Sequence, residues 1–85
     1  MRLGQIIQEE NLVDFEKAIR ILTFLQSVDL DKLMFKDTKY GVVYYVTYYE
    51  KGFVYIEPNF YRGEPEGVQL RIPIKDLADY EVIPE

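Results

Sequence analysis

The side chains that could do acid–base or metal chemistry gather late in the chain, at Glu57, Glu64 and Glu66. A pair of carboxylates can act as general acid and general base, and three can hold a hard cation such as calcium. These glutamates lie in residues 57–67, which are rich in proline, glycine and acids and are predicted to form a loop. Because their spacing matches no known calcium loop, we expect a solvated loop with no catalytic residue, metal or cofactor.

Other kinds of catalytic chemistry lack the residues they require. The chain has no histidine, cysteine or tryptophan, and its single serine is Ser27. Histidine-based triads, thiol nucleophiles and zinc sites built from histidine or cysteine are therefore excluded. Gly63 and Gly67 flank acids, which would repel a phosphate group rather than cradle it. The sequence predicts a protein that is not an enzyme.

The most distinctive residues are aromatic and lie between positions 41 and 58. Two runs of β-favouring residues are joined there by Glu50-Lys51-Gly52, which predicts a hairpin with a three-residue turn ending in glycine. The register that follows pairs Tyr49 with Phe53, Tyr48 with Val54, Thr47 with Tyr55 and Val46 with Ile56. Since side chains alternate between the two faces of a strand, the predicted core face consists of Val42, Tyr44, Val46, Tyr48, Val54 and Ile56.

The opposite face of the hairpin is predicted to carry Val43, Tyr45, Thr47, Tyr49, Phe53 and Tyr55. An aromatic cluster left open to solvent marks a binding surface. We expect the N-terminal helix to cover this face as a second core layer, because the helix needs a surface on which to pack. In the alternative the cluster stays open, at least at its tip, near Tyr49 and Phe53.

The elements that position these residues are a helical region followed by short strands. Residues 3–28 are predicted to be helical, with a break near Glu10-Asn11, and residues 32–83 to be β-rich. Strands are expected at 32–36, 68–72 and 80–83 besides the hairpin, with a helical turn at 75–78 and Pro73 at a strand end or sheet edge. We predict one α+β domain, residues 1–85, with an N-terminal amphipathic helix packed on a small, curved, mostly antiparallel sheet or barrel of about five strands.

The predicted helix has more apolar surface than one small sheet needs. One apolar stripe follows from the three- and four-residue spacing of Phe15, Ala18, Ile19, Leu22 and Leu25. Ile21, Phe24 and Val28 widen it. We favour a helix wedged into its own core, and the alternative is a homodimer in which a second copy packs on the spare side.

Two resemblances bear on architecture and function. Residues 72–83, I-P-I-K-D-L-A-D-Y-E-V-I, are similar to the strand, one-turn helix and short strand that end a Src-homology-3-type barrel. This implies a curved barrel and assigns no functional residue. The stretch Lys51-Gly52-Phe53-Val54-Tyr55-Ile56 resembles the K-G-F-G-F-I motif of cold-shock domains, whose aromatic residues stack on bases. That resemblance implies Phe53 and Tyr55 as stacking residues and Lys51 as a phosphate contact.

The charge balance favours a protein partner over a nucleic acid. With 15 acidic and 10 basic residues the net charge is -5, whereas binding to duplex DNA needs lysines and arginines that replace counterions. We expect a small acidic interaction module that regulates or inhibits another protein with a basic surface. Nucleic-acid mimicry is one version of this, through Glu57, Glu64, Glu66, Asp76, Asp79 and Glu81. Single-stranded nucleic-acid binding through the aromatic hairpin is the alternative.

The candidate binding residues form two neighbouring groups. The hairpin supplies Tyr45, Tyr49, Lys51, Phe53 and Tyr55, and the loop after it supplies Glu57, Phe60, Tyr61, Glu64 and Glu66. No apolar run reaches the roughly 20 residues of a membrane span, and the first residues form no signal-peptide core. With no cysteine for disulfide bonds, a cytoplasmic location is expected.

Overall fold

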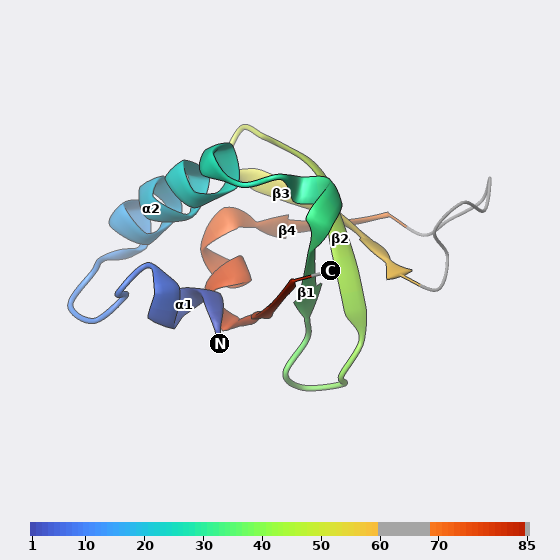
Figure 1. Cartoon of the computed structure of the whole chain (residues 1–85). Coiled ribbons are helices and arrows are strands. Elements are labelled where there is room, and N and C mark those ends of the chain that lie inside the picture. Colours follow the sequence, from blue (N-terminus) through green and yellow to red (C-terminus); the bar gives the residue numbers. More distant parts are fainter. Residues whose placement is uncertain (60–68, 85) are drawn as a thin grey trace.

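Two helices form the N-terminal part of the molecule. The structure, a computed structural model, describes residues 1–59 and 69–84 (Figure 1). Helix α1 spans Leu3–Ile6 and helix α2 spans Asp14–Ser27. Between them Gln8 and Asn11 have left-handed backbone angles, with φ of 56° and 65°, which a right-handed helix cannot contain. The predicted break is thus confirmed. No helix in the described ranges is long and apolar enough to cross a membrane.

Within the described residues, five antiparallel strands form one open sheet. The strands are β1 (Leu33–Lys36), β2 (Val43–Glu50), β3 (Phe53–Pro58), β4 (Leu70–Pro73) and β5 (Glu81–Pro84). Their order across the sheet is β4-β3-β2-β1-β5, so β4 and β5 are its two edges. The predicted α+β class and the antiparallel sheet are confirmed, and of the two predicted architectures the open sheet is observed rather than the barrel.

In the part of the chain that the structure describes, the 3₁₀ helices η1 and η3 connect longer elements. η1 (Leu30–Lys32) leads from α2 into β1, and η3 (Ile74–Asp79) leads from β4 into β5. The helical turn predicted at 75–78 is therefore present and slightly longer. Pro73 is the last residue of an edge strand, as predicted, where its missing N–H is tolerated. The strand, short helix and strand implied by the barrel resemblance are also observed, without closure of the barrel.

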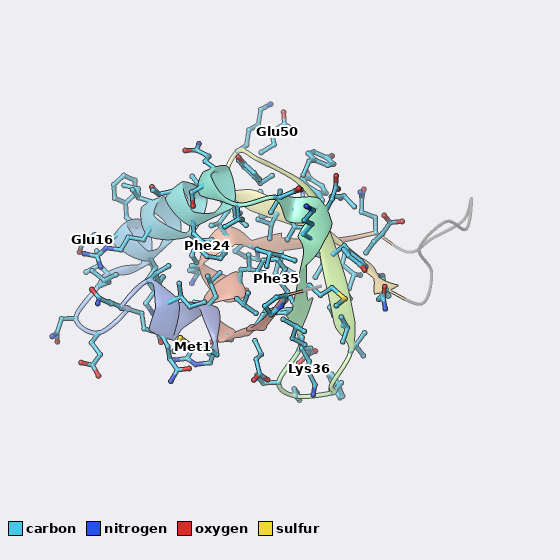
Figure 2. The ribbon with its side chains drawn as sticks, in the orientation of Figure 1. Met1, Glu16, Phe24, Phe35, Lys36 and Glu50 are labelled. Atoms are coloured by element: carbon cyan, nitrogen blue, oxygen red, sulfur yellow. The ribbon has the colours of Figure 1, made fainter. Side chains whose placement is uncertain are left out.

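The hydrophobic core lies between one face of the sheet and the helical segments. Phe35, Val54 and Ile56 are fully buried from the sheet, and they share one cluster with Ile21 of α2 and Leu77 of η3. Figure 1 shows both helices and η3 on the same side of β1 and β2. In Figure 2, Phe24 and Phe35 lie between α2 and the strands. This face is called the inner face below.

The N-terminal helix covers the inner face, so the prediction that it covers the aromatic face is wrong. Ile21 and Leu25 of α2 enter the same core as Val46 of β2, whereas Tyr48 on the opposite face is 45% exposed. The physical reason is the chemistry of the two faces. Aliphatic side chains can be buried without hydrogen-bond partners, but each buried tyrosine hydroxyl would need one.

The predicted apolar stripe of α2 is only partly buried. Ile21 and Leu25, one turn apart, point inward, whereas Phe15 and Ile19 are 74% and 47% exposed. A helix on a sheet buries one stripe of its circumference, and here that stripe is centred on Ile21 and Leu25. Phe15 and Ile19 are therefore left on an outward flank, contrary to the prediction that places them in the buried stripe.

Candidate interaction surface

The hairpin of β2 and β3 departs from the predicted register near its tip. The observed pairs are Tyr45–Glu57, Val46–Ile56, Tyr48–Tyr55, Tyr49–Val54 and Glu50–Phe53. The pair Val46–Ile56 is therefore confirmed, and the predicted pairs beyond it are wrong. The cause is Thr47, which faces no partner of its own and forms a β-bulge between Val46 and Tyr48.

Hydrogen bonds from the side chain of Thr47 hold the bulge. Its hydroxyl donates to the backbone carbonyl of Tyr55 over 3.0 Å, and the side-chain amide of Gln69 donates to that hydroxyl over 3.1 Å. Thr47 thus ties β2 to β3 and to the residue that precedes β4. A local hydrogen bond of this kind replaces the ladder bond that a bulge disrupts.

The turn of the hairpin contains two residues, Lys51 and Gly52, with φ of 51° and 84°. Positive values at both positions define the type I′ turn, whose twist matches that of the flanking strands. A side chain at Gly52 would meet no atom within 4 Å, so glycine is needed there for its backbone angle alone. Lys51, a predicted site residue, is exposed at the tip.

The bulge exchanges the places of two tyrosines relative to the prediction. Tyr48, predicted in the core, lies on the outer face and is 45% exposed. Tyr49, predicted on the aromatic face, lies opposite Val54 and packs against the core. One extra residue reverses the side-chain alternation of the strand beyond it, which is why both predictions fail together.

The outer face of the hairpin carries several aromatic rings. The side chains of Tyr48 and Tyr55 are stacked, with ring centroids 4.2 Å apart and an interplanar angle of 6°. Beside them, the guanidinium of Arg71 on β4 lies 4.5 Å from the centroid of the Phe53 ring, within the range of a cation–π interaction. We call Tyr45, Tyr48, Phe53 and Tyr55 the outer aromatic face.

The hydroxyl of Tyr48 stays protonated well above neutral pH. Partial desolvation, followed by the neighbouring hydroxyl of Tyr55 and the carboxylate of Glu50, raises the pKa of Tyr48 above its ordinary value of 10.0. The side chain therefore presents a neutral ring and a hydroxyl that can donate or accept a hydrogen bond.

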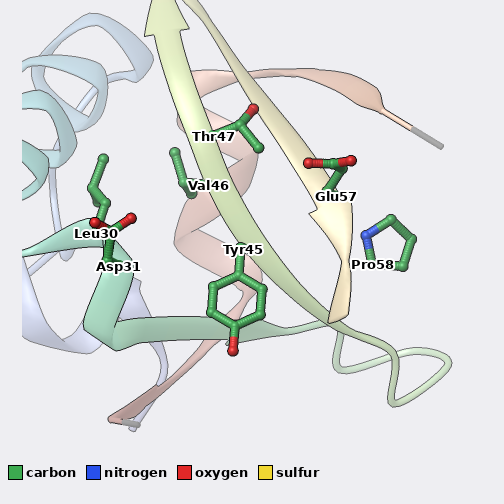
Figure 3. A pocket seen from close by; sticks show the side chains of 7 residues that line it. All are labelled: Leu30, Asp31, Tyr45, Val46, Thr47, Glu57 and Pro58. Carbon is green, nitrogen blue, oxygen red and sulfur yellow. The ribbon is translucent and has the colours of Figure 1, made fainter. Parts of the chain in front are cut away.

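A small cavity adjoins the outer aromatic face on the side of β1. Its volume is about 260 Å³. Its lining consists of Leu30, Asp31, Tyr45, Val46, Thr47, Glu57 and Pro58. Figure 3 shows the Tyr45 ring between Leu30 and Asp31 of η1 on one side and Glu57 and Pro58 of β3 on the other.

The lining of the cavity combines apolar and acidic groups. Leu30, Val46 and Pro58 supply carbon surface, and Tyr45 supplies an aromatic ring. The two ionisable groups, from Asp31 and Glu57, are both acidic. Such a lining suits a long side chain with an aliphatic stem and a cationic head, because the stem can be buried while the charge stays near the carboxylates and the ring.

Several predicted site residues cannot be placed. Phe60, Tyr61, Glu64 and Glu66 lie outside the described residues. Within the described ranges, no group of three or more acidic residues is arranged to hold a metal ion. The predicted residues that do come together are the outer-face residues Tyr45, Phe53, Tyr55 and Glu57, with Lys51 at the tip of the same hairpin.

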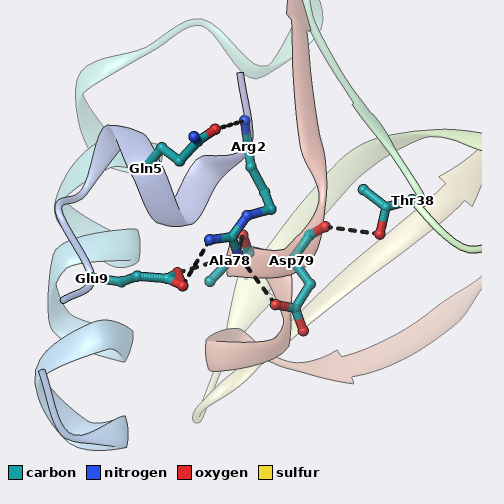
Figure 4. A network of polar contacts seen from close by, with 6 residues as sticks. All are labelled: Arg2, Gln5, Glu9, Thr38, Ala78 and Asp79. Carbon is teal, nitrogen blue, oxygen red and sulfur yellow. Dashed lines mark hydrogen bonds and ion pairs between the residues drawn. The ribbon is translucent and has the colours of Figure 1, made fainter. Parts of the chain in front are cut away.

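A second polar cluster, around Arg2, holds the N-terminal segment against η3. Arg2 forms ion pairs with Glu9 at 2.9 Å and with Asp79 at 3.4 Å, and it donates to the carbonyl of Ala78 over 3.2 Å (Figure 4). The hydrogen bond with Glu9, opposed by desolvation, raises the pKa of Arg2. Because each partner belongs to the chain itself, we interpret the cluster as an attachment of residue 2 to η3.

The surface includes Tyr48, Arg71 and Asp31, which are absent from the predicted site residues. The predicted register places Tyr48 in the core because no feature of the sequence indicates the bulge at Thr47. Arg71 and Asp31 lie far along the chain from the hairpin, and only the strand order brings them beside Phe53 and Tyr45. The alternation of residues 68–72 predicts that Arg71 points outward, but its contact with Phe53 depends on which strands are neighbours.

Comparison with protein-family models, with curated proteins and with solved structures found no match to this chain.

Proposed function

We propose that this protein is a non-enzymatic interaction module that binds another protein through the outer aromatic face. The main observation that supports this proposal is the stacked, partly exposed pair Tyr48–Tyr55 on a face that α2 leaves uncovered. Tyrosine and arginine are enriched at protein interfaces, where a rigid ring provides contact area at low entropic cost. A regulatory or inhibitory role in the cytoplasm fits such a module, and the lack of cysteine agrees with that compartment.

The partner is proposed to present a basic side chain next to an apolar patch. The cavity lined by Asp31, Tyr45 and Glu57 belongs to the same hairpin as the stacked rings and carries acidic groups over carbon surface. The net charge of -5 attracts a basic partner during encounter. The aromatic rings would supply most of the binding affinity, and the acidic cavity would orient the partner. Most of the affinity of a protein interface comes from a few such residues.

Site-specific photo-crosslinking tests this proposal and identifies the partner in the same experiment. A photoreactive benzoyl-phenylalanine placed at Tyr48 is expected to form covalent adducts with one protein in cells of the native host. The matched control is the same analogue at Tyr40, which is 72% exposed and lies in the connection between β1 and β2. Adducts are separated by electrophoresis and identified by mass spectrometry.

Two variants then distinguish specific from nonspecific binding. Tyr55→Ala should weaken capture of the crosslinked partner at least tenfold, as expected for a central aromatic residue of an interface. Tyr40→Ala should leave capture unchanged. Equal adducts from positions 40 and 48, or equal capture by the two variants, would contradict the proposal.

Single-stranded nucleic-acid binding is the alternative function, favoured by the placement of Phe53 and Tyr55 on one face with Arg71 beside them. The ring surface available for stacking is reduced, because Arg71 covers one side of Phe53 and Tyr48 covers one side of Tyr55. Base stacking needs a free ring face. Titration of labelled oligothymidine at low salt is expected to show no binding, and binding that Phe53→Ala abolishes would establish the alternative.

Nucleic-acid mimicry is the less supported version of the protein-binding proposal. Asp79 is paired with Arg2 at 3.4 Å and Glu81 with the N-terminal amine at 3.7 Å. Carboxylates neutralised within the chain are poor imitations of phosphates, which a DNA-binding partner must recognise as free charges. We therefore place the interaction on the aromatic face.

We also propose that a second copy of the chain packs against the outward flank of α2. Phe15, 74% exposed, and Ile19, 47% exposed, lie one turn apart and form an apolar flank that the core leaves free. Light scattering at micromolar concentration should give twice the chain mass, and Ile19→Glu should reduce it to one. A single-chain mass for the unmodified protein would rule out this dimer.

A further inference from the structure

Two unusual features lie close together at the tip of the β2–β3 hairpin. Lys51 has a left-handed backbone angle, with φ of 51°, which strains any residue that carries a Cβ atom. Four residues earlier, Thr47 forms the bulge. The short turn and the bulge depend on each other, because both result from how residues 47–55 are divided between strand and turn.

The same residues can be divided in a second way. The pair Val46–Ile56 is fixed on one side of the bulge. If Glu50 leaves the strand and joins the turn, Thr47 rejoins the ladder and the bulge disappears. The turn then has three residues and ends in glycine, which is a common hairpin turn in which only the glycine is left-handed. Lys51 returns to an unstrained backbone angle.

This second register moves β2 alone. In the structure Tyr49 lies opposite Val54, and Glu50 lies opposite Phe53. After the change Tyr48 would lie opposite Val54, and Tyr49 would lie opposite Phe53. The core therefore receives a tyrosine at the same place in both registers, since the sequence repeats that residue at positions 48 and 49. The pairs between β3 and β4 are the same in both.

We propose that the hairpin tip exchanges between these two registers and that the exchange regulates which groups the outer aromatic face presents. The inference rests on the proposed function for its consequence, but the exchange itself is a property of the free protein. In one register the face offers the Tyr48–Tyr55 stack and the carboxylate of Glu50. In the other it offers a tyrosine ring beside Phe53, with Glu50 withdrawn into the turn.

Each interaction that differs between the registers is weak. The observed register has the hydrogen bonds of Thr47 to Tyr55 and Gln69 and the ring stack of Tyr48. The second register relieves the strain at Lys51 and gains a contact between Tyr49 and Phe53. Surface stacking, exposed hydrogen bonds and left-handed strain each contribute little to the free energy. The free-energy difference between the two registers is therefore much smaller than the contribution of a buried core.

A partner shifts such an equilibrium toward the register that it binds more tightly. A basic surface would select the observed register, because Glu50 lies opposite Phe53 there and its carboxylate is on the outer face. A more apolar surface would select the second register, in which an aromatic ring replaces the carboxylate beside Phe53.

Solution NMR of the free protein tests the exchange. Relaxation dispersion of backbone amides should show exchange at residues 47–52 and none at residues 43–46. Lys51→Asn is the locking variant, because asparagine tolerates the left-handed angle and favours the two-residue turn. It should lower the population of the second register roughly fivefold. A flat profile across residues 47–52 in the unmodified protein would overturn the proposal.

A matched pair of strand variants tests the swap of side chains. Tyr49→Thr removes the ring that the observed register buries, so Tyr48 should turn inward and show nuclear Overhauser contacts to the methyl groups of Val54. Tyr48→Thr should keep Tyr49 in contact with Val54 and suppress the dispersion. If Tyr48 still contacts Tyr55 in Tyr49→Thr, the second register does not exist. Should that variant unfold, Lys51→Asn on the exposed turn decides the question.

The outcomes separate this inference from the proposed function. Crosslinks at position 48 together with a flat dispersion profile would leave a binding surface without a register switch. Dispersion that Lys51→Asn suppresses, with no crosslinked partner, would leave a register switch without the proposed function.

Discussion

The inner and outer faces of the β2–β3 hairpin are made from alternate residues of the same strands, yet they have different physical roles. The inner face buries Val46, Val54 and Ile56 beneath α2 and η3. The outer face carries rings that stack on one another and stay partly exposed, such as Tyr48 and Tyr55. The difference shows that hydrophobic area alone does not decide which face is covered, because a tyrosine hydroxyl must be hydrated or paired.

One tyrosine of the inner face supports the same rule. Tyr44 is buried, and its ring meets that of Tyr80 edge-on at 6.1 Å with an interplanar angle of 68°. Desolvation, followed by the charge of Asp37, raises the pKa of Tyr44. The inner face thus accepts a tyrosine at its margin, where polar groups are near, whereas its fully buried residues, such as Phe35, Val54 and Ile56, have no hydroxyl group.

Neighbouring substitutions in β3 should show the contrast most strongly. Ile56→Ala removes a fully buried side chain and is expected to lower the free energy of unfolding by about 2–5 kcal/mol. Tyr55→Ala, the adjacent outer-face change, loses a surface stack and should cost roughly 1–2 kcal/mol. Urea denaturation measures both. Equal losses would mean that the outer face is a second core.

Substitution in the turn between β2 and β3 should have the next largest effect on stability. Gly52→Ala meets no neighbouring atom but places a Cβ atom at φ of 84°, so we expect a loss of about 1–2 kcal/mol. The control is Lys39→Ala in the exposed connection between β1 and β2, which should change stability by no more than about 0.5 kcal/mol. A neutral Gly52→Ala would show that the tip adopts another turn.

The fold was largely predictable from the sequence because its signals are local. The break between α1 and α2, the strands around the hairpin and the helical turn after Pro73 all follow from spacing and from residues that terminate elements. The side of the sheet that α2 covers was not predictable in this way. Two faces of the hairpin are hydrophobic, and one helix can cover only one of them. The tyrosine hydroxyl groups favour the exposure of the outer face, and hydrophobic periodicity takes no account of hydroxyl groups.

The candidate surface was predictable only as far as strand alternation holds. Tyr45, Phe53 and Tyr55 lie together on the outer face as predicted, and their role in binding stays a prediction. Tyr48 and Tyr49 were exchanged because residues 47–55 fit both a bulge and a longer turn. Arg71 and Asp31 join the surface through contacts between strands and η1 that local spacing cannot reveal.

A pH titration tests the margin of the inner face and should give a smaller effect. Desolvation, followed by the charges of Asp37 and other neighbours, raises the pKa of Tyr80 from 10.0 to about 12. Between these values the unfolded chain releases a proton that the folded chain keeps, so the free energy of unfolding should fall as pH rises from 10 to 12. The effect is reduced because the side chain is only half-buried.

Denaturation at a series of pH values, compared with Tyr80→Phe, isolates this contribution. The variant should lose less stability than the unmodified protein above pH 10, because it has no proton to release at this site. Tyr40→Phe, at a 72% exposed position, controls for the removal of a tyrosine hydroxyl from the surface. Identical pH profiles for Tyr80→Phe and the unmodified protein would contradict the expected effect.

The smallest effect is expected at the outer face itself, from Tyr48→Phe. This change keeps the ring that stacks on Tyr55 at 4.2 Å and removes only a hydroxyl from a 45% exposed side chain. Stability at pH 7 should therefore change by about 0.5 kcal/mol or less, measured by urea denaturation beside Tyr48→Ala. Capture of the crosslinked partner should survive Tyr48→Phe and fail with Tyr48→Ala if the stacked ring makes the contact. Loss of capture with Tyr48→Phe at unchanged stability would instead assign the contact to the hydroxyl. The hydroxyl groups that keep the outer face exposed to water would then also be the groups that bind the partner.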